Sequence, residues 1–326
     1  MEGYIRVRIL LASPIDPQAV QRMHRGFDVR QLSPGDPSEL RAAAADREVV
    51  VLRSGVQLSF DIMSGAPSLR LIVRAGSGLD NIDLDYARER GIRVVRVPGM
   101  SAPPVAEFTF ALLLTLARKV NLADRLIREG HWPKPQLGGS LLRGKVLGIV
   151  GAGNIGGLVG EMGHAWGMRV LGCVAAPNEE VAGRLARRGI TLVDFDEVVA
   201  QADFLTLHVP LDERTHHMVD ASALDRMRPG ALLVNIARGG VVDEKALYDA
   251  LVQDHGIAGA ALDVHESEGE GTVSPLAELP NVVLTPHIGA MALDSQRLIG
   301  ERVIELIEAF HKERLDEEVR DGEHVL

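Results

Sequence analysis

One eleven-residue segment, VLGIVGAGNIG at residues 146–156, constrains the fold more than any other part of the sequence. Its first five residues are apolar and predict a strand, and a helical pattern follows it. Between the two, Gly151 permits a tight turn, Gly153 lets the backbone approach a pyrophosphate, and Gly156 lets the helix pack close to the strand. The helix N-terminus then attracts the phosphates. The segment therefore predicts a doubly wound α/β sheet that binds a dinucleotide, rather than a glycine-rich turn of purely structural use.

The second half of this dinucleotide-binding pattern, an acidic residue that binds the adenosine ribose, is missing. It is expected at the end of the next strand, predicted at residues 169–174, where Val174 stands instead. Loss of the carboxylate removes the repulsion of a 2′-phosphate. However, no Arg or Lys follows closely to hold one, and Glu179 and Glu180 oppose it. We therefore expect weak discrimination between NAD and NADP, with NAD slightly favoured.

Short apolar runs alternate with helical patterns in two series, which predicts two parallel sheets. The strands of the first series are predicted at residues 7–11, 49–52, 71–73 and 93–95. Those of the second are predicted at residues 145–150, 169–174, 204–208, 231–236, 257–263 and 282–285. The length of 326 residues exceeds what one hydrophobic core usually supports, so two domains are expected.

The boundary between the domains is predicted at a Pro-rich break around Pro103, ahead of a long helical pattern at residues 105–129. Residues 131–140 are predicted to form a loop. A last helical pattern at residues 291–313 is free to pack back on the first domain. We therefore expect a first domain of residues 1–102 and 291–326 and a dinucleotide-binding domain of residues 103–290.

Charge and cysteine content exclude several classes of partner and site. The net charge of −10 leaves no basic footprint for nucleic acid, so no such partner is expected. The single cysteine, Cys173, excludes an intramolecular disulfide and a cysteine-based metal site, and suits a reducing cytoplasm. Neither a signal peptide nor a membrane span is visible, and no histidines have metal-ligand spacing. A cytoplasmic protein without metal or membrane partner is predicted.

Three polar residues follow predicted strands of the second sheet: Arg238 in NIARGGVVDE, Glu268 in ALDVHESEG and His287 in LTPHIGA. Parallel sheets bind ligands at the carboxyl ends of their strands, so these side chains are candidates for a site. Taken singly, each has an ordinary explanation: a surface cation, a residue of an acidic loop, and a histidine in a capped turn. Their common placement makes them candidates together.

The segments GAGNIG, NIARGGVVDE, ALDV and LTPHIGA occur in the order and approximate spacing of the D-isomer-specific 2-hydroxyacid dehydrogenase family. RAGSGLDNID at residues 74–83, VAEFTFALLL at residues 105–114, and the His-x-Pro at His208 and Pro210 also resemble family segments. The resemblance covers nearly the whole chain and is nearest to the phosphoglycerate dehydrogenase-like branch. It implies a Rossmann nucleotide domain inserted into a flavodoxin-like substrate domain.

The resemblance also implies that the chain is an enzyme transferring a hydride between NAD(P) and a small D-2-hydroxy acid or 2-keto acid, with Arg238, Glu268 and His287 as its catalytic triad. An imidazole titrates near neutral pH, so His287 suits the acid and base, and Glu268 would orient its ring. Glu266 competes with Glu268, but the family's catalytic Glu lies five residues after the Asp of its LDV motif, here Asp263. Arg238 offers a rigid fork for the keto acid's carboxylate.

The cofactor contacts implied by the resemblance lie at the strand ends of the nucleotide domain, and Asp263 among them would contact the nicotinamide carboxamide. They are Gly151, Gly153, Asn154, Ile155, Gly156, Val174, His208, Pro210, Ile236, Ala237, Arg238, Asp263, His287 and Gly289.

The substrate contacts are predicted in the first domain. Ala75, Gly76, Ser77 and Gly78 form a loop of small residues whose N–H groups suit the substrate carboxylate, with a flexible turn as the alternative. Arg53 and Ser54 follow a strand, and Arg53 is a candidate to hold a distal anionic group.

Three positions depart from the family pattern. Gly269 stands where Pro commonly follows the catalytic Glu, and Ser101 stands where Asn is frequent. His265 replaces the aromatic residue often found after ALDV, and we interpret it as a packing residue. These departures predict a more mobile loop and an unusual substrate fit.

Other functions remain open at this stage. Glyoxylate or hydroxypyruvate reduction, or reduction of a specialised keto acid, fits the same pattern, and a nucleotide-sensing co-repressor is the alternative from another class. The partners predicted by resemblance are a small keto or hydroxy acid and a second copy of the chain, bound through the helix predicted at residues 105–129.

Overall fold

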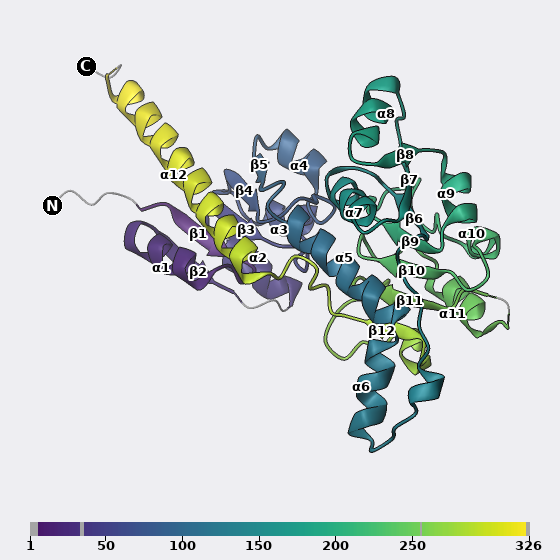
Figure 1. Cartoon of the computed structure of the whole chain (residues 1–326). Helices are drawn as coiled ribbons and strands as arrows, with labels where there is room; N and C mark the ends of the chain where they lie inside the picture. The colour runs from purple at the N-terminus through teal and green to yellow at the C-terminus, as the bar shows by residue number, and fades with distance from the viewer. Residues whose placement is uncertain (1–5, 33–35, 255, 324–326) are drawn as a thin grey trace. The chain divides into compact units, whose positions relative to one another are not determined.

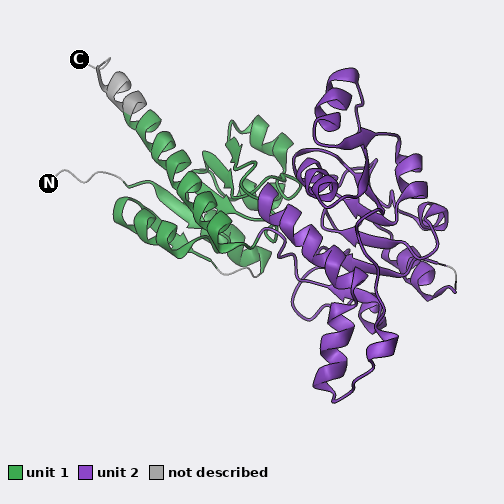
Figure 2. Cartoon of the chain, in the orientation of Figure 1, with its two compact units in different colours: residues 1–101, 291–326 green, residues 102–290 purple. Residues whose placement is uncertain are grey.

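The computed structural model describes residues 6–32, 36–254 and 256–323, with side chains described as far as residue 315. The chain divides into two compact units (Figures 1 and 2). Unit 1 comprises residues 1–101 and 291–326, and unit 2 comprises residues 102–290. The second unit is therefore inserted into the first in sequence.

Unit 1 contains a five-stranded sheet in the order β2-β1-β3-β4-β5, with every described pair parallel. Its strands are β1 (Arg8–Leu11), β2 (Asp28–Gln31), β3 (Val49–Leu52), β4 (Leu71–Arg74) and β5 (Arg93–Arg96). This is the flavodoxin-like strand order, so the predicted fold of the first domain is confirmed. β2 is not among the predicted strands, because this edge strand is the polar run DVRQ and buries none of its four residues.

The helices of unit 1 are mostly short. They are α1 (Pro17–Gly26), α2 (Pro37–Ala44), α3 (Phe60–Ser64), α4 (Leu84–Glu89) and α12 (Leu293–Glu323). Asp16, Asp36 and Asp83 cap three of them with their carboxylates, which satisfies N–H groups that lack helical partners. The last helix extends ten residues past the predicted end at 313. It buries Ile299, Val303, Ile304 and Ile307 in the core beside β1 and α1.

Unit 2 contains a seven-stranded parallel sheet in the order β12-β11-β10-β9-β6-β7-β8. Its strands are β6 (Val146–Val150), β7 (Arg169–Cys173), β8 (Ile190–Leu192), β9 (Phe204–Leu207), β10 (Leu232–Asn235), β11 (Gly259–Leu262) and β12 (Val282–Leu284). Counted from β6, this is the Rossmann order 3-2-1-4-5-6 with one further strand, as predicted. β8 is not among the predicted strands, because it has only three residues.

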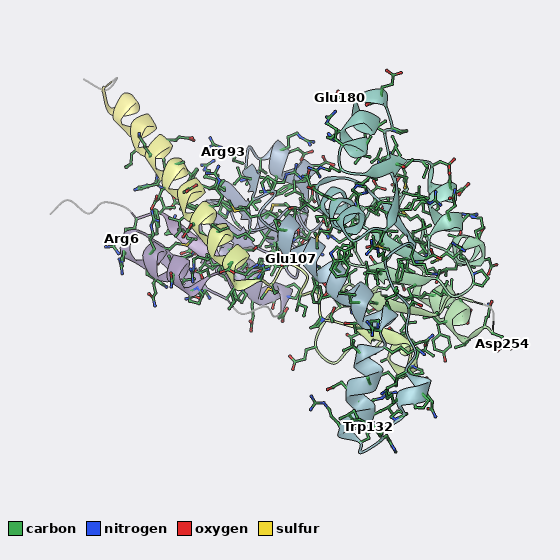
Figure 3. All side chains as sticks on the ribbon, in the orientation of Figure 1. Arg6, Arg93, Glu107, Trp132, Glu180 and Asp254 are labelled. Atoms are coloured by element: carbon green, nitrogen blue, oxygen red, sulfur yellow. The ribbon has the colours of Figure 1, made fainter. Side chains whose placement is uncertain are left out.

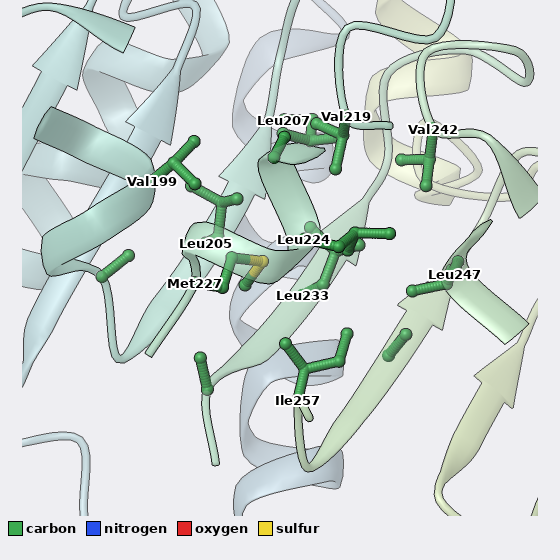
Figure 4. Close-up of a cluster of buried hydrophobic side chains, with 14 of the residues drawn as sticks. Val199, Leu205, Leu207, Val219, Leu224, Met227, Leu233, Val242, Leu247 and Ile257 are labelled. Atoms are coloured by element: carbon green, nitrogen blue, oxygen red, sulfur yellow. The ribbon is translucent and has the colours of Figure 1, made fainter. Parts of the chain in front are cut away.

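Helices cover both faces of this sheet. They are α5 (Ala102–Ala117), α6 (Val120–Arg128), α7 (Asn154–Ala165), α8 (Glu179–Ala186), α9 (Phe195–Gln201), α10 (Ala221–Arg226) and α11 (Glu244–Val252), with short 3-10 turns η1 (Lys134–Gln136) and η2 (Pro275–Glu278). Alternate residues of β6 enter different cores, Val146 and Val150 with α9 to α11, and Leu147 and Ile149 with α5 and α7. Figure 4 shows part of the first of these cores, built mainly from aliphatic side chains.

The prediction of a single helix at residues 105–129 is wrong. The chain turns at Lys119, whose φ of 53° lies in the left-handed region, and two helices result. The physical reason is a change of environment: α5 is apolar and buries ten residues, whereas α6 buries none. The predicted loop at 131–140 contains η1. Among the described residues, no helix is both long and apolar enough to cross a bilayer.

Candidate active site

The glycine loop between β6 and α7 requires its glycines at two positions. Gly151 has a φ of 92°, and a Cβ there would lie 2.7 Å from His208 O. At Gly156 a Cβ would lie 2.3 Å from Gly151 O, so α7 begins closer to the loop than any side chain allows. At Gly153, the N-cap of α7, nothing lies within 4 Å, which leaves open space before the helix N-terminus. These features fit a dinucleotide pyrophosphate, and Asn154 and Ile155 form the first turn that would face it.

The expected ribose position lies beside this loop. The N–H groups of Gly151 and Ala152 donate to Cys173 O at 3.1 and 3.0 Å, and Val174 follows directly. Val174 is half-buried and packs against the core shared by α5 and α7, so it offers the ribose no acceptor from its side chain. Cys173 is buried, and burial is the main reason that its thiol pKa is raised.

His208 follows β9 with its ring nitrogens in contrasting surroundings. Nε2 lies 3.0 Å from Thr206 Oγ1, and Nδ1 is buried with no partner among the described residues. Burial lowers the pKa of His208 to about 3, so the ring is neutral at physiological pH. Pro210 follows, and its carbonyl accepts from Thr215 Oγ1 at 2.7 Å.

Glu268 and His287 form a direct pair. His287 Nδ1 lies 3.1 Å from Glu268 Oε2, and the backbone N–H of His265 donates to Glu268 Oε1 at 3.2 Å. Burial raises the pKa of Glu268, but the hydrogen bond and charge of His287 together with the contacts of His265 outweigh burial and leave that pKa below its ordinary value. The carboxylate is therefore ionised beside the imidazole.

Glu266, the competing candidate, has a different partner. Its Oε1 lies 2.9 Å from His217 Nε2 and accepts from the backbone N–H of Glu244 at 3.2 Å. The reciprocal bond from Glu266 N to Glu244 Oε1 is 2.8 Å. The two acids of this loop are thus engaged separately, and only Glu268 contacts His287.

Asp263 organises the loop that carries His287. Its Oδ1 accepts from Thr285 Oγ1 at 2.6 Å and from Ile288 N at 2.9 Å, and its Oδ2 accepts from Gly289 N at 2.7 Å. Its backbone carbonyl accepts from His287 N at 2.7 Å. The side chain is 1% exposed. These bonds hold His287 at a φ of 54°, a conformation that few residues other than glycine adopt.

Arg238 lies in a tight turn after β10. Asn235 builds the turn, accepting from Ala237 N at 3.1 Å and donating to Arg238 O at 2.9 Å, and Ile236 and Ala237 are buried within it. Arg238 Nη1 donates to Ala237 O at 2.6 Å. The next residue, Gly239, packs against the segment of Glu268, because a Cβ on it would lie 1.8 Å from His265 O. The structure thus brings the Arg238 turn against the loop of the Glu268–His287 pair.

The predicted substrate residues of unit 1 lie at the ends of β3 and β4. The backbone N–H of Arg53 donates to Ser13 Oγ at 3.0 Å, Arg53 Nη1 lies 3.1 Å from Met291 Sδ, and burial lowers the pKa of the Arg53 guanidinium. Ser54, next to it, is half-buried. In the second loop, Ser77 Oγ lies 3.0 Å from Ser101 Oγ.

Arg74 is not among the predicted site residues. It ends β4, is 5% exposed, and lies so close to the loop of Ala75, Gly76, Ser77 and Gly78 that a Cβ on Gly76 would meet its Nη1 at 2.3 Å. The sequence feature that points to Arg74 is a charged residue at the end of the otherwise apolar strand LIVR. No group of side chains suited to a metal ion occurs among the described residues.

Comparison with known proteins identifies the family. Residues 110–289 match the model of the NAD-binding domain of D-isomer-specific 2-hydroxyacid dehydrogenases. The chain is 38% identical to a hydroxypyruvate reductase of Thermotoga maritima, over 94% of this chain and 98% of that protein. It is also 38% identical to a D-3-phosphoglycerate dehydrogenase of Archaeoglobus fulgidus, over 92% of this chain but 56% of that protein.

A solved structure agrees with these sequence matches. The D-lactate dehydrogenase of Aquifex aeolicus, described in complex with NAD and lactic acid, superposes with a TM-score of 0.82 at 30% identity, covering 95% of this chain and 96% of that one. Together with the two sheet orders and the glycine loop, these matches show that the chain belongs to the D-isomer-specific 2-hydroxyacid dehydrogenase family and is an NAD(P)-dependent oxidoreductase.

Proposed function

We propose that the chain interconverts a small 2-keto acid and the corresponding D-2-hydroxy acid, with His287, Glu268 and Arg238 as the catalytic residues. The observation that carries this proposal is the 3.1 Å contact between His287 Nδ1 and Glu268 Oε2. A carboxylate beside an imidazole stabilises the imidazolium and fixes the ring's orientation. That is the arrangement an acid and base at a carbonyl carbon requires.

The pairing assigns the two ring nitrogens of His287. Nδ1–H donates to Glu268, so Nε2 is the nitrogen that exchanges a proton with substrate. When bound, the reduced nicotinamide supplies the hydride that the keto carbon accepts. In reduction, Nε2 gives its proton to the carbonyl oxygen as that oxygen gains charge, and in oxidation Nε2 takes the hydroxyl proton back. The Arg238 guanidinium neutralises the substrate carboxylate and polarises the carbonyl.

We assign the binding of the substrate's anionic groups in unit 1 to two segments. Ala75, Gly76, Ser77 and Gly78 would hold the carboxylate, with the Arg74 charge buried against this loop. Arg53 and Ser54 would hold a distal group. The similarity of Arg53 and Ser54 to the phosphoglycerate dehydrogenase-like branch favours a phosphate as this distal group. The alternative substrates are hydroxypyruvate and glyoxylate, which appear in the names of the relatives from Thermotoga maritima and Korarchaeum cryptofilum.

We propose NAD as the preferred form of the cofactor. Val174 offers neither an acceptor for the ribose nor a cation for a 2′-phosphate. The α8 N-terminus that follows carries Glu179 and Glu180, the latter exposed at the edge of unit 2 in Figure 3, and their charge opposes a phosphate. The preference for NAD is therefore expected to be modest. His208, Pro210, Ile236, Ala237, Asp263 and Gly289 remain proposed cofactor contacts.

We propose that the working form is a homodimer paired through α5, α6 and the loop that follows. The described part of this region exposes large apolar side chains, namely Val120, Ile127, Trp132 and Leu141, and Trp132 is 81% exposed (Figure 3). A second copy of the same surface would bury them. A Trp132→Lys variant that sediments as a monomer where the parent sediments as a dimer would support this arrangement, and an unpaired parent would refute it.

The reaction is tested by following absorbance of the reduced nicotinamide with NADH or NADPH in turn. The panel of substrates is 3-phosphohydroxypyruvate, hydroxypyruvate, glyoxylate and bulkier keto acids. Oxidation of the cofactor by one of them, lost in His287→Ala, is the expected result. Cofactor binding without turnover on any member would refute the proposed reaction on these substrates.

A further inference from the structure

His265 touches the segments that carry all three proposed catalytic residues. Its backbone N–H donates to Glu268 Oε1 at 3.2 Å, and its ring Nε2 lies 3.0 Å from the carbonyl of Thr285, two residues before His287. Its own carbonyl is the atom that a Cβ on Gly239, next to Arg238, would meet at 1.8 Å. One residue therefore joins the three loops that follow β10, β11 and β12.

The ring of His265 has a defined hydrogen-bonding state. A carbonyl oxygen only accepts, so Nε2 carries the hydrogen in the contact with Thr285 O. Nδ1 is buried and has no partner among the described residues. A buried nitrogen without a hydrogen-bond partner costs free energy of folding. A ring that served only to fill space would not need to carry such a nitrogen. An aromatic hydrocarbon of similar size fills the same space without that cost.

The contacts of His265 close a ring of interactions around the proposed acid and base. From Thr285 the chain runs two residues to His287, whose Nδ1 meets Glu268 Oε2, and Glu268 Oε1 returns to the backbone of His265. Thr285 itself is fixed by its hydroxyl, which donates to Asp263 Oδ1. The hydrogen bond from the His265 ring therefore sets the distance between the loop of Glu268 and the strand end that leads to His287.

We propose that His265 is a positioning residue, which holds Glu268 in register with His287 through the Nε2–H bond to Thr285 O. This role goes beyond the packing role that the sequence favoured for His265. The inference rests on the proposed function of Glu268 and His287. The aromatic residue frequent at this position in the family lacks a ring N–H to make the bond, so this chain adds a link between the two loops.

The test compares three variants. His265→Phe keeps the ring volume and removes the donor, and His265→Gln keeps a donor, because its carboxamide nitrogen stands about as far from the backbone as Nε2. His311→Phe is the matched control: it also replaces a half-buried histidine with an unpartnered Nδ1, in α12 of unit 1. Thermal unfolding followed by circular dichroism establishes that each is folded. If His265→Phe is not folded, His265→Asn, too short to reach Thr285, replaces it.

The expected kinetic result is a fall in kcat of about fivefold to tenfold in His265→Phe, the effect of losing one orienting hydrogen bond. The KM for keto acid and the Kd for NADH should stay unchanged, because Arg238 and the glycine loop are untouched. His265→Gln should recover most of the kcat, and His311→Phe should keep it. An unchanged kcat in His265→Phe, a Gln variant no better than Phe, or an equal fall in His311→Phe would overturn the proposal.

A second readout does not depend on turnover. Long-range 1H–15N spectra of protein labelled with 15N-histidine report the ring nitrogens of His287, assigned from a His287→Gln variant. The signals of His287 should move in His265→Phe and return in His265→Gln. If the parent turns over no keto acid, the proposed function fails while this comparison still decides the role of His265. Unmoved His287 signals in His265→Phe would refute it.

Discussion

Replacement of Gly239 by Ala tests whether the Arg238 turn and the Glu268 loop form one catalytic unit. A Cβ at this position would lie 1.8 Å from His265 O and 2.3 Å from its carbonyl carbon, whereas real contacts stay beyond about 3.0 Å. Neither atom belongs to a flexible side chain, so one loop must retreat by more than an ångström. Glu268 moves with the loop, because its Oε1 is bound to His265 N.

The magnitude follows from that displacement. A misplacement of about 1 Å in a catalytic group costs on the order of 100-fold in rate, and overpacking of this kind costs about 1–3 kcal/mol of stability. Gly230→Ala is the matched control, since Gly230 has a φ of 80° but nothing within 4 Å, so Ala there costs stability alone.

The assay measures kcat for keto-acid reduction together with the free energy of unfolding in urea for both variants. We expect similar losses of stability and a loss of kcat only in Gly239→Ala. Equal kcat values for the two variants would refute the reasoning, because the close approach of the loops would then have no bearing on catalysis.

Four further outcomes are expected. His287→Ala should lower kcat by about 10²-fold to 10⁴-fold while the Kd for NADH, measured by fluorescence, is retained; undiminished turnover would end the proposed mechanism. Val174→Asp should raise the ratio of kcat/KM with NADH to that with NADPH, because a ribose acceptor that repels the 2′-phosphate is restored, and an unaltered ratio would count against the assigned position. Asp263→Asn should lower the free energy of unfolding in urea by about 2–3 kcal/mol, since the acceptor of Gly289 N becomes a donor, and equal stability would contradict the loop-holding role. Because folding lowers the pKa of Glu268, the ionised carboxylate stabilises the folded chain at pH values above its ordinary pKa of 4.5, and this contribution is lost as pH falls through the folded-state pKa. In a plot of the urea midpoint against pH, Glu268→Gln should therefore lose less stability on the acid side than the parent. Curves of the same shape for the parent and the variant would refute the pairing.

The overall fold was accessible from sequence because it rests on local patterns. The glycine loop, the apolar central strands and the return of the last helical pattern each depend on residues close together in the chain. The missed elements are those whose local pattern is weak: β2 (Asp28–Gln31) is polar along an edge, and β8 (Ile190–Leu192) is very short. The break at Lys119 could not be predicted, because the segments on both sides of it have a helical pattern.

The site was accessible only in part. Glu266 and Glu268 lie in the same acidic loop, and only the spacing from Asp263 known from the family, not the chemistry of the loop, favoured Glu268. The distinction arises from partners distant in sequence, His217 for one and His287 for the other. The ring bond of His265 likewise depends on a carbonyl twenty residues away. Such contacts are set by tertiary packing, so the partner of each side chain cannot be read from the residues next to it.

The return of α12 (Leu293–Glu323) to unit 1 has a consequence for synthesis on the ribosome. Ile299, Val303, Ile304 and Ile307 complete a core whose other members precede the whole of unit 2 in the chain. The first segment of unit 1, residues 1–101, therefore emerges before unit 2 and keeps apolar surface uncovered until unit 2 has been made and α12 follows it. Unit 2, which is continuous in sequence, has all its strands available earlier. During synthesis, unit 1 should thus finish folding after unit 2, although its first residues are made before those of unit 2. Chaperones are most able to bind the nascent chain while the core of unit 1 still lacks α12.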